Sequence, residues 1–192
     1  MRLYRVFPWD PAAAANQSGG ALFSVDSGDN RISNIDLYKT FYLAAEPEAA
    51  VAEALGHLFA WRPATFLHGI SPLALADYEL ADSVSIFALD DVDALRTIGI
   101  QQPSRVITRD RTITQAWARI IYQRNAYIGA CWWSYYNPDW KAYGLWNISS
   151  LRLACAPETL TIDSPAVVIA AKAIAKQRLG KRKQRSNKRK LP

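Results

Sequence analysis

The order of strand-like and helix-like segments is the feature of this sequence that most constrains its fold. Short apolar runs rich in β-branched and aromatic residues are typical of strands. Such runs cover 3–7, 41–45, 73–80, 84–89 and 126–134, with one or two more within 151–162. A doubly wound sheet needs a helix after each strand, and these runs show no such regular alternation. We therefore predict an α+β domain.

Helical spacing of apolar residues predicts four helices. The first begins at Pro47, and its apolar stripe contains Val51, Leu55, Leu58 and Phe59. The other three cover 91–98 with Gly99 as a C-cap, a segment that begins at Thr114, and a segment from Ser164-Pro165 to Gly180. In the last helix, Val168, Ala171 and Ala175 are expected to face the core.

Residues 8–40 are expected to lack regular structure, because prolines, glycines and small polar residues interrupt them throughout. So long an irregular stretch is uncommon in a compact domain and is more often functional than idle. We therefore look for site residues within it.

The net charge of +6 belongs to the C-terminal tail. Residues 181–192 hold seven of the 23 Lys and Arg residues and no acid, so 16 cations face 17 acids in residues 1–180. A nearly neutral body does not indicate nucleic-acid binding. We expect a domain over 1–180, followed by a basic, disordered tail whose only contact with nucleic acid would be weak.

The cysteines and histidines are too few to form a disulfide framework or a zinc site. The chain has Cys131 and Cys155, and also His57 and His68. We interpret both cysteines as structural side chains in a reducing compartment. A Cys–His nucleophile pair remains an alternative, although neither cysteine lies in a nucleophile motif.

The apolar runs are shorter than the ~20 residues that a membrane-spanning helix requires. The N-terminus also lacks the apolar core and cleavage site of a secretory signal. The expected location is the cytoplasm, without a membrane partner.

Four sequence blocks resemble the RES-domain family, the toxins of RES–Xre toxin–antitoxin pairs, and they occur in the family's order. The blocks are LYRV with Arg5, GDNRISNIDLYKTFYLA with Arg31 and Tyr42, AAVAEAL with Glu53, and GACWWSYY with Ser134. The likeness extends over nearly all of residues 1–170 and includes the Arg, Glu and Ser that give the family its name. One departure is Asn30, which stands where family members often have glycine before the arginine.

The resemblance implies an ADP-ribosyltransferase-like toxin fold, with mixed β-sheets flanked by helices, that cleaves the nicotinamide–ribose bond of NAD+. It implies a catalytic set of Glu53, Ser134, Arg31 and Tyr42, with Arg5, Arg31, Tyr42 and Ser134 binding NAD+. NAD+ is the substrate, and no true cofactor or metal is expected. The acceptor stays open among water, inorganic phosphate and a protein side chain. The implied protein partner is an Xre-type antitoxin, although a solitary RES protein with another role is also open.

Each of the five residues also has an ordinary structural interpretation. Arg5 and Arg31 could be solvated surface arginines, although Arg5 lies in an apolar strand, where a charge needs a partner. Glu53 lies about 200° around the helix from the start of the apolar stripe, as solvated glutamates do. Tyr42 could be a core tyrosine, and Ser134 a hydrogen-bonded strand end.

Two hypotheses therefore remain. The first is an NAD+-cleaving enzyme, whose five residues should converge on one cleft with Glu53 within reach of Ser134 or Tyr42. The second is a non-enzymatic module that binds nucleic acid or a protein through the tail at 181–192.

Overall fold

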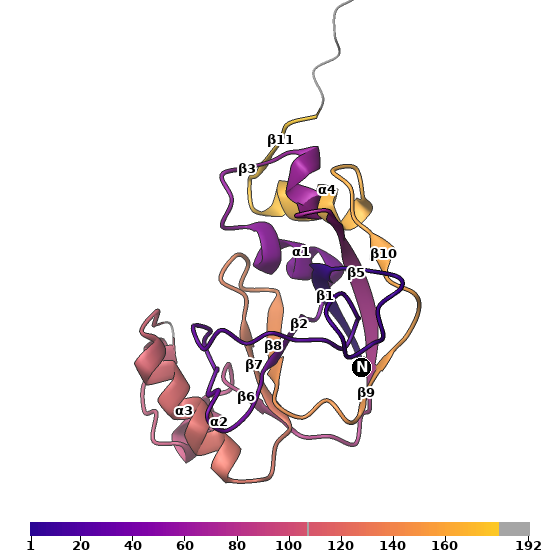
Figure 1. Ribbon diagram of the computed structural model, residues 1–192. Coiled ribbons are helices and arrows are strands. Elements are labelled where there is room, and N and C mark those ends of the chain that lie inside the picture. Colours follow the sequence, from indigo (N-terminus) through magenta and orange to yellow (C-terminus); the bar gives the residue numbers. More distant parts are fainter. Residues whose placement is uncertain (107, 181–192) are drawn as a thin grey trace, which may run out of the picture.

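Two long antiparallel strands form one half of a mixed β-sheet (Figure 1). The computed structural model describes residues 1–106 and 108–180. The strands β1 (Arg2–Pro8) and β5 (Ser71–Leu80) pair over seven positions, and β4 (Leu67–His68), β9 (Leu151–Leu153) and β10 (Glu158–Thr159) pair with β5. Alternation along β1 buries Leu3 and Phe7 on one face, as expected for period-two packing.

The other half contains β2 (Phe41–Ala44), β8 (Lys141–Leu145), β7 (Gly129–Trp133) and β6 (Ile86–Ala88). The complete order is β10–β5–β1–β2–β8–β7–β6, and β6 runs parallel to β7. The two halves meet at a single paired position, Tyr4 opposite Ala44, whereas β2 and β8 pair over four positions. The sheet is therefore least connected between β1 and β2.

The four helices form two pairs at the two ends of the molecule, and α1 packs against strands of both halves of the sheet. The helices α1 (Pro47–Leu55) and α4 (Pro165–Ala173) pack together at one end, where Val51, Trp61 and Val167 are fully buried. At the other end lie α2 (Val92–Thr97) and α3 (Arg111–Gln123), beside β6 and β7 (Figure 1). This arrangement confirms the predicted α+β class.

Shorter elements complete the fold. The strand β3 (Ala60–Trp61) pairs in parallel with β11 (Gln177–Arg178), and the 3₁₀ turns are η1 (Pro63–Phe66) and η2 (Pro103–Val106). Residues 9–40 contain one isolated bridge, between Asn34 and Tyr38, and otherwise no helix or strand. The irregular stretch predicted over 8–40 is thus confirmed, apart from Pro8, which ends β1.

The structure corrects three helix predictions. The helix α3 begins at Arg111 rather than Thr114, because the Asp110 carboxylate accepts a hydrogen bond from the Thr112 amide at 2.9 Å and caps it. The helix α1 ends at Leu55, so Phe59 lies beyond it and is 91% exposed.

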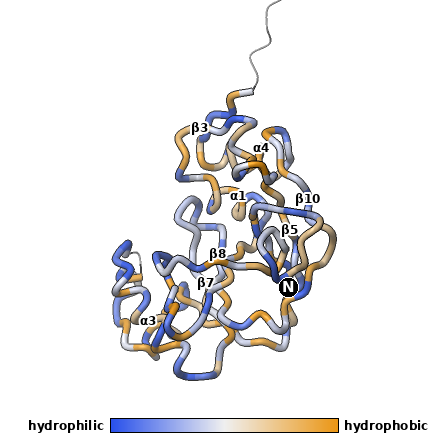
Figure 2. Tube along the Cα trace, in the orientation of Figure 1, coloured by the Kyte–Doolittle hydropathy of each residue, from blue (hydrophilic) through white to orange (hydrophobic). Residues whose placement is uncertain are grey.

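The last helix, α4, ends at Ala173 and not at Gly180. Ala175 adopts a positive φ of 54°, and the chain then forms β11. Ala171 is buried as predicted, but Val168 and Ala175 are exposed. Apolar residues cover most of α4, as the hydropathy colouring in Figure 2 shows, so its sequence does not mark which face is buried.

Candidate functional site

A cavity of about 250 Å³ lies where β1 and β2 meet, beneath α1. Three of the five predicted residues line it, namely Arg5, Tyr42 and Glu53. Its other lining residues are Tyr4, Val6, Asn30, Leu43, Ala44, Ala50, Ala54, Trp132, Ala142 and Tyr143. The lining therefore combines a carboxylate, a guanidinium and several aromatic rings.

The Glu53 carboxylate reaches the cavity from the exposed side of α1, and Ser134 holds it in place. The Ser134 hydroxyl donates a hydrogen bond to Glu53 Oε1 at 2.6 Å. Ser134 is 6% exposed, and its Oγ accepts a hydrogen bond from the Tyr136 amide at 3.2 Å. Ser134 therefore acts on the cavity through Glu53, since it fixes the direction of the carboxylate.

Tyr42 contributes to the cavity from β2. Its ring centroid lies 6.5 Å from that of Trp132, in an edge-on arrangement. Its hydroxyl lies 3.0 Å from the Ser33 hydroxyl. Burial raises the pKa of Tyr42 to about 12, so the phenol keeps its proton near neutral pH.

Arg5 is a nearly buried cation at the junction of β1 and β2. It donates a hydrogen bond to the Phe23 carbonyl at 2.7 Å and stacks over the Phe41 ring at 4.3 Å. Burial lowers the pKa of this guanidinium. The partner expected from the sequence is thus a carbonyl and an aromatic face, and Arg5 forms no ion pair with a carboxylate of the described residues.

Arg31 lies at the edge of the cavity rather than in its lining. It donates a hydrogen bond to the Val106 carbonyl at 2.9 Å, and its guanidinium carbon is 5.9 Å from the centre of the Trp132 ring. Burial lowers the pKa of Arg31, and the neighbouring charge of Arg111 adds to this effect, whereas Glu53 opposes it. Arg31 is therefore within electrostatic reach of Glu53.

The structure thus brings the five residues, from four sequence blocks, to one region. Glu53 contacts Ser134, and Arg5 and Tyr42 share its cavity. Sequence reasoning missed Asp26 and Ser33, which connect to Tyr42, although the DSG segment at Asp26 carries the signature of an Asx turn. For Trp132, in the aromatic block around Ser134, it left two interpretations open: a core residue, or part of a stacking wall for nicotinamide or adenine.

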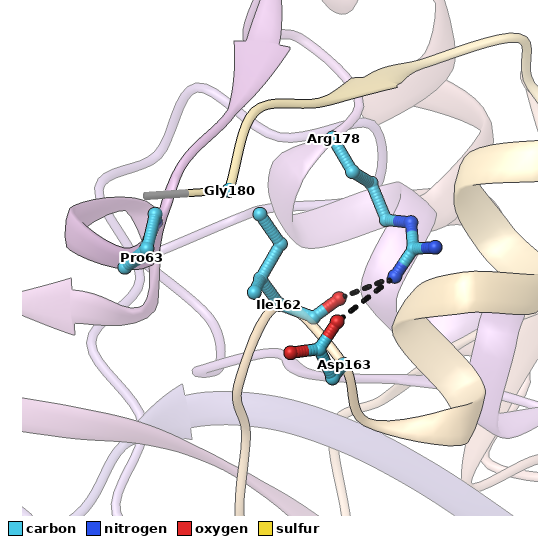
Figure 3. Close-up of a pocket in the computed structure, with 5 residues that line it drawn as sticks. All are labelled: Pro63, Ile162, Asp163, Arg178 and Gly180. Carbon is cyan, nitrogen blue, oxygen red and sulfur yellow. Dashed lines mark hydrogen bonds and ion pairs between the residues drawn. The ribbon is translucent and has the colours of Figure 1, made fainter. Parts of the chain in front are cut away.

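A second hollow, of about 370 Å³, lies near the end of the described chain (Figure 3). It is lined by Pro63, Ile162, Asp163, Arg178 and Gly180. Arg178 donates a hydrogen bond to the Ile162 carbonyl at 2.8 Å and lies 3.5 Å from Asp163. Its charge is thus already balanced, which makes this hollow a weaker candidate site despite its greater volume.

A comparison with models of protein families shows to which family the chain belongs. The family model described as the RES domain matches residues 2–163, which include all five residues discussed above. The chain belongs to the RES family. A search among curated protein sequences gives no match to this RES protein.

The fold is also similar to a solved structure, a chain in the crystal structure of the M. tuberculosis MbcT–MbcA toxin–antitoxin complex. The TM-score is 0.54 at 14% sequence identity, and the match covers 91% of this chain and 89% of the other. A likeness at this identity establishes a shared fold. Within residues 1–106 and 108–180, no helix is long and apolar enough to cross a membrane.

Proposed function

We propose that this RES protein is a toxin that binds NAD+ and breaks its nicotinamide–ribose bond. The observation that carries the proposal is the hydrogen bond of 2.6 Å between Ser134 and Glu53, which holds a carboxylate at a cavity flanked by two arginines. NAD+ offers the complementary groups, because its pyrophosphate is an anion and its ribose becomes cationic in the transition state.

The carboxylate supplies the electrostatic part of the reaction. As the C–N bond to nicotinamide breaks, its electron pair stays with the nicotinamide nitrogen, and positive charge develops on the ribose. A carboxylate fixed beside the sugar stabilises that charge. In the proposed complex, Glu53 takes this role and Ser134 maintains its orientation. The bond to the acceptor then forms at the same ribose carbon.

The arginines provide the binding part. A guanidinium matches phosphate oxygens with paired donors, and a buried guanidinium without a carboxylate partner gains most from an anion. Arg5 meets this description, and Arg31 lies at the same cavity edge. The Tyr42 and Trp132 rings complete a wall suited to a flat nicotinamide.

The proposal includes a protein partner. The similar solved structure is a toxin–antitoxin complex, and the resemblance given above implies the toxin component of an RES–Xre pair. We therefore expect an antitoxin of the Xre type to bind this chain and to cover the cavity. The proposed site of action is the cytoplasm, where NAD+ is available.

The test is to incubate the purified protein with NAD+, with and without inorganic phosphate, and to identify the products by mass spectrometry. Free nicotinamide is expected, together with ADP-ribose, its phosphate ester or an ADP-ribosylated protein, which identifies the acceptor. Glu53→Gln is the matched control and should lose about 100-fold or more in kcat while remaining folded. Folded wild-type protein that leaves NAD+ intact would refute the proposal.

A further inference from the structure

A partly buried network of hydrogen bonds connects Tyr42 to the irregular segment that precedes β2. The Asp26 carboxylate accepts hydrogen bonds from the Gly28 amide at 3.0 Å, the Ser33 hydroxyl at 2.6 Å and the Thr40 amide at 3.1 Å. These donors span thirteen positions of chain, from 28 to 40. One carboxylate therefore closes the segment that contains Arg31.

The network reaches Tyr42 through Ser33, which is 2% exposed. The two hydroxyl oxygens of Ser33 and Tyr42 are 3.0 Å apart. Burial acts to raise the pKa of Asp26, but hydrogen bonds from Ser33, Gly28 and Thr40 outweigh it and hold the pKa below its ordinary value. Because an ionised carboxylate only accepts, Ser33 donates its proton to Asp26.

The direction of the second hydrogen bond follows from the first. A serine hydroxyl has one proton, and that of Ser33 is used on Asp26. The Ser33 oxygen must then accept from Tyr42, whose phenol is protonated. The Tyr42 hydroxyl thus donates its one proton to Ser33, in the irregular segment, and not to a group in the cavity.

The same segment is anchored on its outer side by α3. The Gln115 side chain donates hydrogen bonds to the carbonyls of Gly28 and Asn30 at 2.7 and 2.9 Å. Asn34 in turn donates to the Gln115 carbonyl at 3.0 Å. The segment is therefore held between α3 and β2, and its inner attachment is the chain from Asp26 through Ser33 to Tyr42.

We propose that Asp26 and Ser33 are positioning residues of the NAD+ site. By occupying the Tyr42 hydroxyl, they make the ring of Tyr42, and not its hydroxyl, the surface that meets the substrate. The Asp26 carboxylate also fixes the segment that carries Arg31. One carboxylate thus determines both the hydrogen bonding of Tyr42 and the position of the Arg31 segment. This inference rests on the proposed NAD+-cleaving function.

The proposal separates two roles that Tyr42 could have. If its hydroxyl serves only the network, Tyr42→Phe removes the bond between the two hydroxyls, whereas Ser33→Ala removes that bond and the one to Asp26, so the effect of Ser33→Ala should be equal or larger. Each is expected to raise KM for NAD+ about threefold to tenfold, with little change in kcat. Tyr42→Leu also removes the aromatic face and should lower kcat/KM further, to about 30-fold below wild type.

The experiment is a double-mutant cycle with NAD+ as substrate, comparing wild type, Ser33→Ala, Tyr42→Phe and the double variant. The expected result is that Tyr42→Phe has no further effect on kcat/KM in the Ser33→Ala background, because Ser33→Ala has already removed the bond between the two hydroxyls. Ser24→Ala is the matched control, because it removes a hydrogen bond of the same segment, to the Thr40 carbonyl at 3.0 Å. It should lower thermal stability without a change in KM.

Two results would overturn the positioning role in an active enzyme. Additive effects of Ser33→Ala and Tyr42→Phe would show that the two hydroxyls act independently. A loss for Tyr42→Phe far greater than for Ser33→Ala, with kcat affected, would show that the Tyr42 hydroxyl itself contacts the substrate. Folded wild-type protein that neither binds nor cleaves NAD+ would refute the proposed function instead.

Discussion

At the scale of single residues, the candidate site depends on how polar groups are oriented rather than on how many are present. Glu53 is exposed on α1, and a solvated glutamate would sample many rotamers. The hydrogen bond from the nearly buried Ser134 limits that freedom. A carboxylate that is already oriented needs less reorganisation during the reaction, which is a main source of electrostatic catalysis.

We therefore predict that Ser134→Ala lowers kcat for NAD+ cleavage about tenfold, which is less than Glu53→Gln does. The reason is that Glu53 remains present but loses its orienting donor. In the Glu53→Gln background, Ser134→Ala should cost little more. Steady-state kinetics of the four proteins checks this, and a full additional loss in the double variant would show that Ser134 touches the substrate directly.

Asp26 gives a prediction about acid stability. The pKa of Asp26 in the folded protein lies below its ordinary value. Asp26 therefore contributes fully to the free energy of unfolding above about pH 4, the pKa of an aspartate in the unfolded chain. That contribution is lost as the pH falls through the folded pKa. Asp26→Asn should thus lower the free energy of unfolding by about 1–3 kcal/mol at pH 7. The difference from wild type should narrow below about pH 4 in urea titrations. A difference that does not vary with pH would contradict the assignment.

At the scale of secondary-structure elements, the sequence predicted those with strong periodicity and missed those defined by pairing. The first strands and α1 begin as expected, and Glu53 does lie outside the buried face of α1. The strand β8 was not predicted, because KAYGL has neither clear alternation nor an apolar run, and pairing with both β2 and β7 stabilises it.

The candidate site was predictable to the extent that resemblance supplied the residues. Periodicity alone indicated a solvated Glu53, and no local signal connected it to Ser134, because their hydrogen bond joins positions 81 apart. The link from Asp26 to Tyr42 was missed for the same reason, since it depends on the folded path of an irregular segment. Such contacts are tertiary and have no period in the sequence.

The C-terminal end of α1 packs against the residues that follow β7, where Gly56 lies beside Tyr136. A methyl group added at Gly56 would collide with the Ala52 carbonyl oxygen and with the Tyr136 ring. Gly56→Ala should therefore destabilise the protein by about 1–3 kcal/mol and displace Tyr136, whose amide contacts Ser134. The midpoint temperature of thermal unfolding and kcat should both be lower than in the wild type. Gly99→Ala, at a surface turn with φ of 82° and open space around it, is a control that strains the backbone without affecting kcat.

At the scale of the whole molecule, the cavity lies where the cores meet, and its lining includes the core residues Leu43, Ala44 and Trp132. One core lies among α2, α3, β6 and β7, and another lies between α1 and α4. The cavity lies between them, at the weakly connected junction of β1 and β2. The polar groups of Arg5 and Glu53 therefore enter the cavity beside buried apolar side chains.

The basic tail gives the prediction for the whole chain. Residues 181–192 lie outside the described part, and the five site residues lie before them. Deletion of 181–192 should leave kcat and KM for NAD+ within about twofold of wild type, because near-neutral residues 1–180 contain the cavity. Loss of NAD+ cleavage on deletion would favour the alternative in which the tail is the working part.

The single paired position between β1 and β2 also determines how the two halves of the sheet are held together. Since only one residue pair joins the two strands in the ladder, side-chain packing carries most of the contact between the halves, and Leu3, Phe41 and Tyr78 belong to one core cluster across the junction. A dinucleotide that contacts Arg5 on one half and the Tyr42 and Trp132 rings on the other would act as a brace across that junction. Bound substrate would then add to the side-chain packing that already joins the two halves of the protein, and each turnover would remove that contribution.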